Sequence, residues 1–226
     1  PVPAIADVCE REGLWLHVDT AYGGSAAVVP EMRWVLEGCE RADSLVVNPH
    51  KWLFVPVDLS VLFTRKPDVV RAAFSLVPEY LRTAEEAVAP NLMDYGVSLG
   101  RRFRALKLWM VIRGFGTEGL AARIREHIRL ARLFHSWVDA DRAFEIAAPM
   151  PFSVVCFRAR FDGVPAEEAD RRNQMLMEAV NATGEAYLSH TKLRGRTVLR
   201  LAVGNLRTEE RHVRRAWELL RENAQR

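Results

Sequence analysis

Short apolar runs alternate with helical segments over the first 64 residues, and this alternation limits the possible folds most strongly. Residues 14–19, 44–48 and 58–64 have the composition of buried strands. Residues 4–12 and 30–41 have the spacing of helices. Strands that alternate with helices in this way predict an α/β fold with a mainly parallel sheet. In such sheets, functional side chains gather at the carboxyl ends of the strands.

The rest of the chain has a different order of elements. Residues 76–98 show no sustained periodicity and predict a long loop, and long loops in compact domains usually have a function. Helices are predicted over residues 99–110, 120–138, 165–183 and after Thr208, and strands over residues 144–147, 152–160, 186–189 and 197–203. We therefore expect two parts: a portion of a large α/β domain (residues 1–112) and a small α+β domain (residues 113–226).

The composition excludes several classes of protein. Of the 226 residues, 49% are hydrophobic and 27% are charged, and the formal net charge is +3, which is typical of a soluble globular protein. Lysine supplies only four of the 32 basic residues, and the arginines are scattered among acidic residues, which favours a solvated surface over nucleic-acid binding. No apolar run approaches the roughly 18–20 residues of a membrane span, so we expect no membrane partner.

We predict no catalytic or metal-binding role for the cysteines and most of the histidines. The three cysteines are far apart and form no C-x-x-C motif, which is typical of buried free thiols in a reducing cytoplasm: Cys9, Cys39 and Cys156. Three histidines in arginine-rich helical segments are predicted at the surface: His127, His135 and His212. His190 is predicted to lie in a turn.

Two polar segments follow predicted strands, and each contains a residue with strong chemical potential. Asp19 ends the first strand, and Lys51 follows the second beside Trp52 in an apolar setting. Desolvation of this lysine would favour its neutral, nucleophilic amine, which forms Schiff bases with aldehydes. A carboxylate nearby can hold a pyridine nitrogen protonated, and pyridoxal 5'-phosphate (PLP) needs this pairing to accept electrons.

Two other interpretations of these residues stay open at this point. Lys51 and Asp19 could form a simple buried ion pair. Alternatively, His17 and Asp19 share one face of a strand and His50 could join them around a metal ion. No H-x-x-H or C-x-x-C motif completes such a ligand set, so no metal is predicted.

Several longer stretches resemble one known family and occur in that family's order. They are LWLHVDTAYGG at residues 14–24, NPHKW at 48–52, PEYL at 78–81, LGRRFRALKLW at 99–109 and VLRLA at 198–202. The sequence resembles the C-terminal half of a group II PLP-dependent decarboxylase of the aromatic-L-amino-acid decarboxylase type. The resemblance implies the PLP-dependent transferase fold (fold type I, aspartate aminotransferase-like).

The resemblance also implies a role for each matching residue. Lys51 would form the Schiff base with PLP, and Asp19 would bond the protonated pyridine nitrogen. Ala21 would lie against the ring. Asn48 and His50 would help to hold the phosphate and to order the lysine.

Tyr80 matches the family tyrosine that closes over the site and returns a proton to the substrate carbon after carbon dioxide leaves. Its loop works near a dimer interface in the family, so a homodimer is implied. The implied function is a carboxy-lyase that converts an aromatic L-amino acid to its amine. In aldehyde-forming relatives a phenylalanine commonly replaces this tyrosine. Because this chain keeps the hydroxyl, plain decarboxylation is favoured, and an aldehyde-forming oxidative decarboxylase on the same cofactor is the first alternative.

Family members are considerably longer than this chain, and the additional part is N-terminal. It includes the histidine that stacks on the cofactor, most phosphate contacts and much of the substrate pocket. We therefore expect a fragment with exposed sheet edges and apolar surface, poorly stable and weakly active alone. A non-catalytic remnant that acts as a binding or regulatory module is the second alternative.

Overall fold

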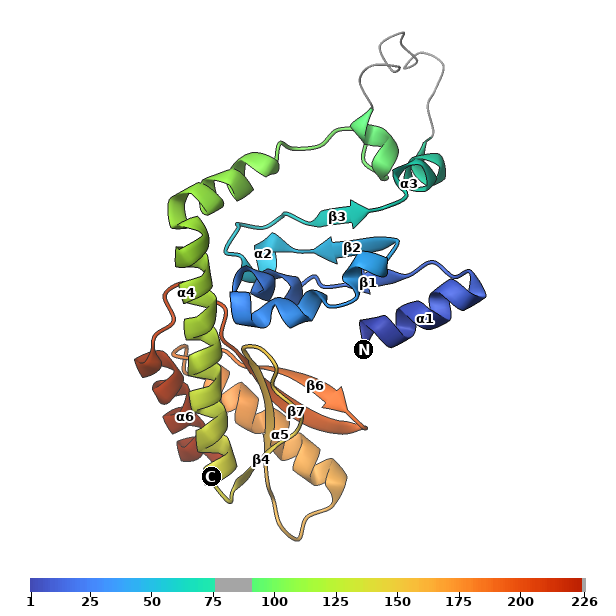
Figure 1. Ribbon diagram of the computed structural model, residues 1–226. Coiled ribbons are helices and arrows are strands. Elements are labelled where there is room, and N and C mark those ends of the chain that lie inside the picture. The colour runs from blue at the N-terminus through green and yellow to red at the C-terminus, as the bar shows by residue number, and fades with distance from the viewer. Residues whose placement is uncertain (76–90, 225–226) are drawn as a thin grey trace. The chain divides into compact units, whose positions relative to one another are not determined.

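The computed structural model describes residues 1–75 and 91–224 and divides the chain into two compact units, Pro1–Thr117 and Glu118–Arg226 (Figure 1). The sequence predicts the boundary at residue 112, and the structure divides the chain at Thr117. Each unit has its own sheet, three-stranded in the first and four-stranded in the second. Tyr80 lies outside the described residues.

Unit 1 consists of a small sheet with short helices. Its elements are α1 (Val2–Glu12), β1 (His17–Asp19), the 3₁₀ helices η1 (Gly23–Val28), η2 (Pro30–Leu36) and η3 (Cys39–Arg41), β2 (Ser44–Val47), α2 (Pro49–Trp52), β3 (Val61–Thr64), α3 (Pro67–Phe74), η6 (Leu92–Tyr95) and the first part of α4 (Ala105–Ala140). α1 ends as predicted, at Gly13 in the left-handed region with φ 65°. The first strand is shorter than predicted.

The unit 1 sheet has the order β1-β2-β3 and mixed strand directions. β1 and β2 are parallel, with Asp19 paired to Val46, as predicted. β3 is antiparallel to β2 and pairs Leu62 with Val46, so the sheet of the described residues is mixed and not mainly parallel as expected. A parallel connection needs a crossover that returns along the sheet, usually a helix. α2 has only four residues, so the chain re-enters the sheet near the end where β2 stops.

The helix predicted over residues 30–41 is also wrong, because two 3₁₀ segments, η2 and η3, occupy this region. Gly38 separates them with φ 79°, a conformation that breaks a regular helix. A Cβ at this position would lie 2.8 Å from Cδ of Pro3. Gly38 therefore allows both the change of direction and the close approach of α1.

α4 begins later than predicted but is divided where the sequence predicts a break. The expected start near residue 99 moves to Ala105. Gly116, with φ 65° and ψ 168°, is not helical, so the expected end of the first helix at residues 114–116 is confirmed. The second helical part covers the predicted residues 120–138 and ends at Ala140.

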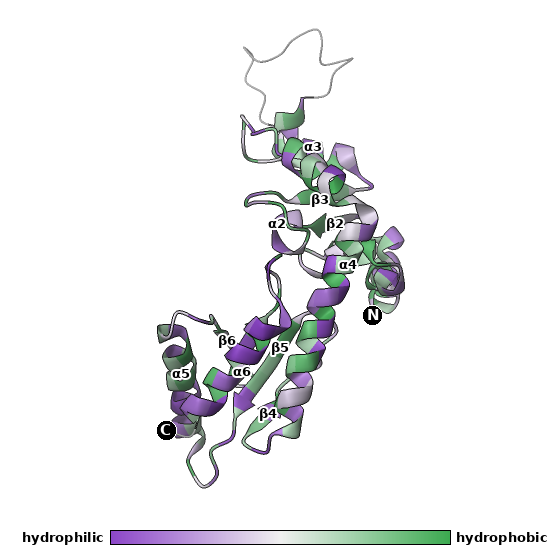
Figure 2. Cartoon of the chain, turned by 90° about the vertical axis from the view of Figure 1, so that its left-hand side faces the viewer, coloured by the Kyte–Doolittle hydropathy of each residue, from purple (hydrophilic) through white to green (hydrophobic). Residues whose placement is uncertain are grey.

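Unit 2 forms an antiparallel sheet with helices. After α4 come β4 (Phe144–Ile146), β5 (Val154–Ala159), α5 (Ala166–Ala182), β6 (Ser189–Leu193), β7 (Arg196–Ala202) and α6 (Glu210–Ala224). The strand order is β4-β5-β7-β6, and all neighbours are antiparallel. Figure 2 shows β5 coloured as hydrophobic and much of α6 as hydrophilic. Phe134, Phe157 and Leu220 lie in one continuous core cluster with 16 other buried residues.

Three predictions for individual side chains in this region and elsewhere are corrected. His190 lies in β6 and not in a turn; the turn is Arg194–Gly195, where both residues have positive φ, as a two-residue hairpin requires. His127 is only 1% exposed, because it lies on the inner face of α4 and its Nε2 is 3.1 Å from the carbonyl oxygen of Asn205. The cysteines are free as predicted but only partly buried: Cys9, Cys39 and Cys156.

Candidate active site

The two polar segments predicted to carry chemistry lie next to each other in unit 1. The Asn48 N–H donates to the carbonyl oxygen of Ala21 at 3.0 Å. The rings of Tyr22 and Trp52 stack with centroids 4.7 Å apart and an interplanar angle of 18°. These contacts join the carboxyl end of β1 to the carboxyl end of β2, where α2 begins and carries Lys51.

Asp19 is the exposed last residue of β1. Its Oδ1 accepts the N–H of Ala21 at 2.9 Å, which fixes the carboxylate at the start of the turn. Among the residues that the structure describes, Asp19 makes no ion pair and its other carboxylate oxygen has no hydrogen bond. This oxygen is therefore available to a ligand. Ala21 itself is buried, at 6% exposure. Its N–H donates to Asp19, and its carbonyl oxygen accepts the N–H of Asn48.

Lys51 is exposed, so the predicted desolvation is wrong for this chain. Adjacent residues of a helical turn point in different directions, and here Trp52 takes the inward position with no exposed surface. The stack of Trp52 on Tyr22 then holds α2 in place and leaves the amine of Lys51 accessible. Within the described ranges Lys51 and Asp19 form no salt bridge, so the alternative of a buried ion pair is also wrong.

Asn48 and His50 are held by Leu59 and Ser60, in a segment that no sequence motif marks. The Leu59 N–H donates to Nδ1 of His50 at 2.9 Å, and the Ser60 hydroxyl donates to Oδ1 of Asn48 at 2.6 Å. The Asn48 carbonyl oxygen also accepts the N–H of Lys51 at 2.9 Å. No sequence signal pointed to Leu59 and Ser60, because their position depends on how the chain returns from α2 to β3.

His17 is occupied with a structural partner. Its Nδ1 lies 2.7 Å from the hydroxyl oxygen of Ser44, the residue it faces in the parallel register. The indole N–H of Trp15 donates to the same oxygen at 2.9 Å. In the part of the chain that the structure describes, no three histidine, cysteine or carboxylate side chains gather in a way that could hold a metal ion.

Comparison with known proteins decides the family. The model of the pyridoxal-dependent decarboxylase conserved domain matches residues 1–160. This chain belongs to the pyridoxal-dependent decarboxylase family. Tryptophan decarboxylase TDC2 of Camptotheca acuminata is 45% identical over 223 residues, which are 97% of this chain and 45% of that protein. Phenylacetaldehyde synthase of Arabidopsis thaliana is 42% identical over 99% of this chain and 46% of its own length.

A solved structure supports the same relationship. The crystal structure of Oryza sativa tryptophan decarboxylase with PLP and tryptamine has a TM-score of 0.92 and 44% sequence identity, and the match covers 100% of this chain and 47% of that one. The predicted α/β fold of the PLP-dependent transferase type is thereby confirmed. This pyridoxal-dependent decarboxylase chain spans about half the length of the curated relatives it matches.

The side chains present in this chain fit the cofactor of its family. PLP offers an aldehyde, a pyridine nitrogen and a phosphate. Lys51 has an accessible amine for the first. For the second, Asp19 has a carboxylate oxygen that bonds to no residue in the described part of the chain. Asn48 and His50 lie on the same joined segments and retain hydrogen-bond donors for the third.

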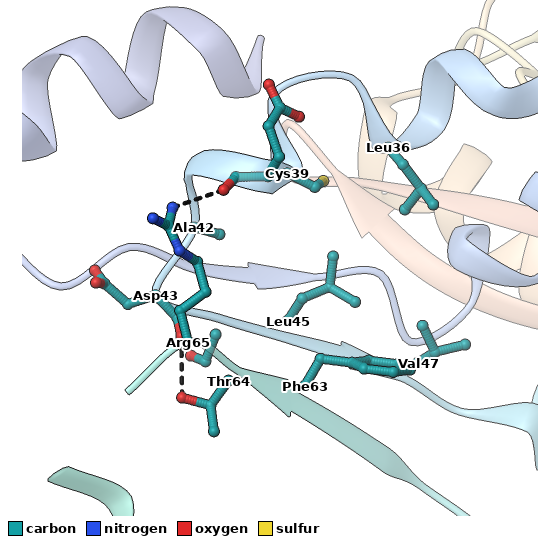
Figure 3. Close-up of a pocket in the computed structure, with 11 residues that line it drawn as sticks. Leu36, Cys39, Ala42, Asp43, Leu45, Val47, Phe63, Thr64 and Arg65 are labelled. Atoms are coloured by element: carbon teal, nitrogen blue, oxygen red, sulfur yellow. Dashed lines mark hydrogen bonds between the residues drawn. The ribbon is translucent and has the colours of Figure 1, made fainter. Parts of the chain in front are cut away.

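An apolar groove lies on the face of the unit 1 sheet opposite Asp19 (Figure 3). Because side chains alternate along a strand, Asp19, Val46 and Leu62 share one face, and Leu45 and Phe63 point to the other. The groove measures about 680 Å³ and has a mainly apolar lining: Leu36, Ala42, Leu45, Val47 and Phe63, with the rim residues Asp43 and Arg65. It is therefore separate from the candidate cofactor residues. In the described ranges no helix is both long and apolar enough to cross a membrane.

Proposed function

We propose that the protein to which this chain contributes is a carboxy-lyase that converts an aromatic L-amino acid to its amine and carbon dioxide with PLP. One observation carries the proposal: the turn that follows Asp19 and the turn that carries Lys51 are joined at the carboxyl ends of two parallel strands. The hydrogen bond from Asn48 to Ala21 makes this junction. The site thus combines an amine and a carboxylate, as PLP chemistry requires.

The residues of this chain would divide the work as follows. The accessible amine of Lys51 holds the cofactor covalently, and the free oxygen of Asp19 keeps the proton on the pyridine nitrogen. When bound, PLP supplies a positively charged ring that accepts the electron pair left on the substrate carbon as carbon dioxide departs. Ala21 would lie against the ring, and its backbone N–H keeps the Asp19 carboxylate oriented.

Two further roles belong to this proposal. Asn48 and His50 would donate hydrogen bonds to the phosphate and so fix the position of the ring. The hydroxyl of Tyr80 would return a proton to the substrate carbon. A homodimer in the cytoplasm is also part of the proposal, which the family resemblance and the free thiols support.

The substrate class is proposed from the relatives. A protein that is 45% identical is named a tryptophan decarboxylase, and the Oryza sativa crystal structure contains tryptamine, the amine of tryptophan. Both support an aromatic substrate for the present chain.

An aldehyde-forming oxidative decarboxylase is the second candidate, and the phenylacetaldehyde synthase of Arabidopsis thaliana, 42% identical, favours it. Tyr80 argues for the simple decarboxylase because its hydroxyl can protonate the substrate carbon before oxygen reacts there. Measurement of amine together with hydrogen peroxide and ammonia separates the two functions. Amine alone supports decarboxylation, and aldehyde with peroxide supports the alternative.

The first experiment is borohydride reduction of the purified chain with PLP, followed by peptide mass mapping. We expect the pyridoxyl group on Lys51, with the other three lysines bare, and no such label in the Lys51→Ala variant. Label spread evenly over all lysines, or none, would contradict cofactor binding by this chain. It would then support the alternative of a non-catalytic remnant.

A further inference from the structure

Leu59 and Ser60 occupy the hydrogen-bond acceptors of the two residues proposed to hold the phosphate. The Leu59 N–H is bonded to Nδ1 of His50, and the Ser60 hydroxyl is bonded to Oδ1 of Asn48. A neutral histidine has one acceptor nitrogen and one N–H, and an asparagine amide has one acceptor oxygen and two N–H donors. The contact to Leu59 uses the single acceptor nitrogen of a neutral His50 ring. The contact to Ser60 turns the amide oxygen of Asn48 toward Ser60 and its NH2 group away from Ser60.

The contact to His50 also decides where its proton lies. An N–H group can donate to Nδ1 only when Nδ1 carries no proton. The proton of His50 is therefore on Nε2, and the ring is neutral as long as the Leu59 contact persists. The result is an uncharged donor whose direction is set by the backbone.

The segment that carries Leu59 and Ser60 is itself fixed at its other end. Nε and Nη2 of Arg104 donate to Oδ2 of Asp58 at 3.0 and 2.8 Å. Nζ of Lys107, in the first turn of α4, donates to the carbonyl oxygen of Pro56 at 2.8 Å. Leu59 is buried, at 3% exposure.

Both partners of the ion pair between Arg104 and Asp58 stay charged over a wide pH range. The hydrogen bond from Arg104 lowers the pKa of Asp58 to about 2, so the carboxylate is ionised in all ordinary buffers. Arg104, just before α4, and Lys107, in its first turn, therefore anchor residues 56–60, and these residues in turn orient Asn48 and His50.

We propose that Ser60 and Arg104 are positioning residues that make Asn48 and His50 a pair of uncharged donors for the phosphate group of the cofactor. This inference rests on the proposed function, because that function supplies the phosphate. The physical reason is that a phosphate has only acceptor oxygens at neutral pH. An acceptor atom turned toward it would repel it, and residues 59–60 prevent this by holding Nδ1 of His50 and Oδ1 of Asn48 toward themselves.

The first test measures the histidine tautomer in the full chain without any ligand. The chain has six histidines, and ¹⁵N NMR of histidine-labelled protein assigns His50 by comparison with His50→Gln. We expect the pattern of a neutral ring protonated on Nε2. Arg104→Gln should convert it to a mixture of tautomers, whereas Arg211→Gln, which removes an exposed ion pair to Glu209, should not. A proton on Nδ1 of His50, or an unchanged signal in Arg104→Gln, would overturn the proposal.

The second test compares binding of PLP with binding of pyridoxal, which lacks the phosphate. Loss of one oriented hydrogen bond predicts that Ser60→Ala weakens PLP binding about five- to tenfold. The affinity of Ser60→Ala for pyridoxal should equal that of wild type. Ser136 is an exposed serine on α4, and the control Ser136→Ala should bind both PLP and pyridoxal as wild type does. Equal losses for both ligands in Ser60→Ala would indicate general damage and would overturn the positioning role, and so would no loss for either.

The two tests also separate this proposal from the proposed function. If the wild-type chain binds neither PLP nor pyridoxal, cofactor binding by this chain is wrong. The tautomer of His50 and its response to Arg104→Gln then still show whether the contact between Arg104 and Asp58 controls the position of the His50 proton.

Discussion

The two units differ in how many of their apolar side chains are buried and how many are exposed. Among the described residues, 25 buried hydrophobic side chains lie in unit 2 and 11 in unit 1. Of the 21 exposed large hydrophobic side chains, 19 belong to unit 1, including Phe63 and Trp109; only Met175 and Tyr187 belong to unit 2. Burial of apolar surface is the main driving force of folding, and large exposed apolar patches mark interaction surfaces. Unit 2 therefore resembles a self-contained domain, and unit 1 presents surfaces for further polypeptide.

Separation of the units should produce the largest effect. We expect residues 118–226 alone to unfold cooperatively with a stability on the order of 5 kcal/mol, the lower range for a small domain. Residues 1–117 alone should bind a hydrophobic dye and unfold without a sharp transition. Urea titration followed by circular dichroism measures both. A sharp transition for residues 1–117, or none for residues 118–226, would break the comparison.

Matched phenylalanine substitutions should show the same contrast in the whole chain. Phe157 has no exposed surface and packs edge-on against Phe134 with ring centroids 5.1 Å apart. Phe157→Ala should therefore cost about 3–5 kcal/mol. Phe63 is 57% exposed, and Phe63→Ala should change the free energy of unfolding by less than about 0.5 kcal/mol. Similar losses for both variants in urea unfolding would show that unit 1 covers Phe63 in solution.

The contrast also explains which parts of the fold the sequence could predict. In unit 2, apolar periodicity follows burial directly, so the helical spacing from Leu120 to Val138 and the strand around Val155 were predicted correctly. In unit 1 the 3₁₀ segments on either side of Gly38 depend on the approach of Pro3, a contact between distant parts of the chain. Local spacing does not contain that information, and it predicted a regular helix.

The candidate site shows the same division between local and distant information. The sequence identifies four site residues, because they lie at or just after strand ends and match a family pattern: Asp19, Asn48, His50 and Lys51. The hydrogen bond between Asn48 and Ala21 places their two segments together. The exposure of Lys51 was not predicted, because it depends on the stacking of Trp52 on Tyr22. Their roles in catalysis, like that of Tyr80, remain predictions.

A buried amide in unit 2 gives an intermediate effect. Asn173 has no exposed surface; it accepts the N–H of Ala159 at 2.8 Å and donates to the carbonyl oxygens of Ala159 and Ala169. Asn173→Ala leaves buried backbone groups without partners and should cost about 2–3 kcal/mol. The neighbouring Gln174→Ala, which removes one exposed contact to Glu178, is the control and should cost a few tenths. Equal effects in thermal unfolding would contradict a sealed unit 2 core.

The smallest effect should appear only in mild acid and concerns His127. Burial lowers the pKa of this histidine, and the nearby Arg123 adds to the shift, whereas the hydrogen bond to Asn205 and the charge of Glu126 oppose it. The unfolded chain therefore binds a proton near the ordinary histidine pKa of about 6.5, where the folded chain does not. The stability from a neutral His127 is present above this pH and is lost as the pH falls toward the lower folded pKa. His127→Gln should remove this part of the slope of unfolding free energy between pH 8 and pH 5, although it shifts the whole curve by its packing change. A slope equal to that of wild type would show that His127 titrates in the folded chain as it does in the unfolded one, and that this face of α4 is open to water.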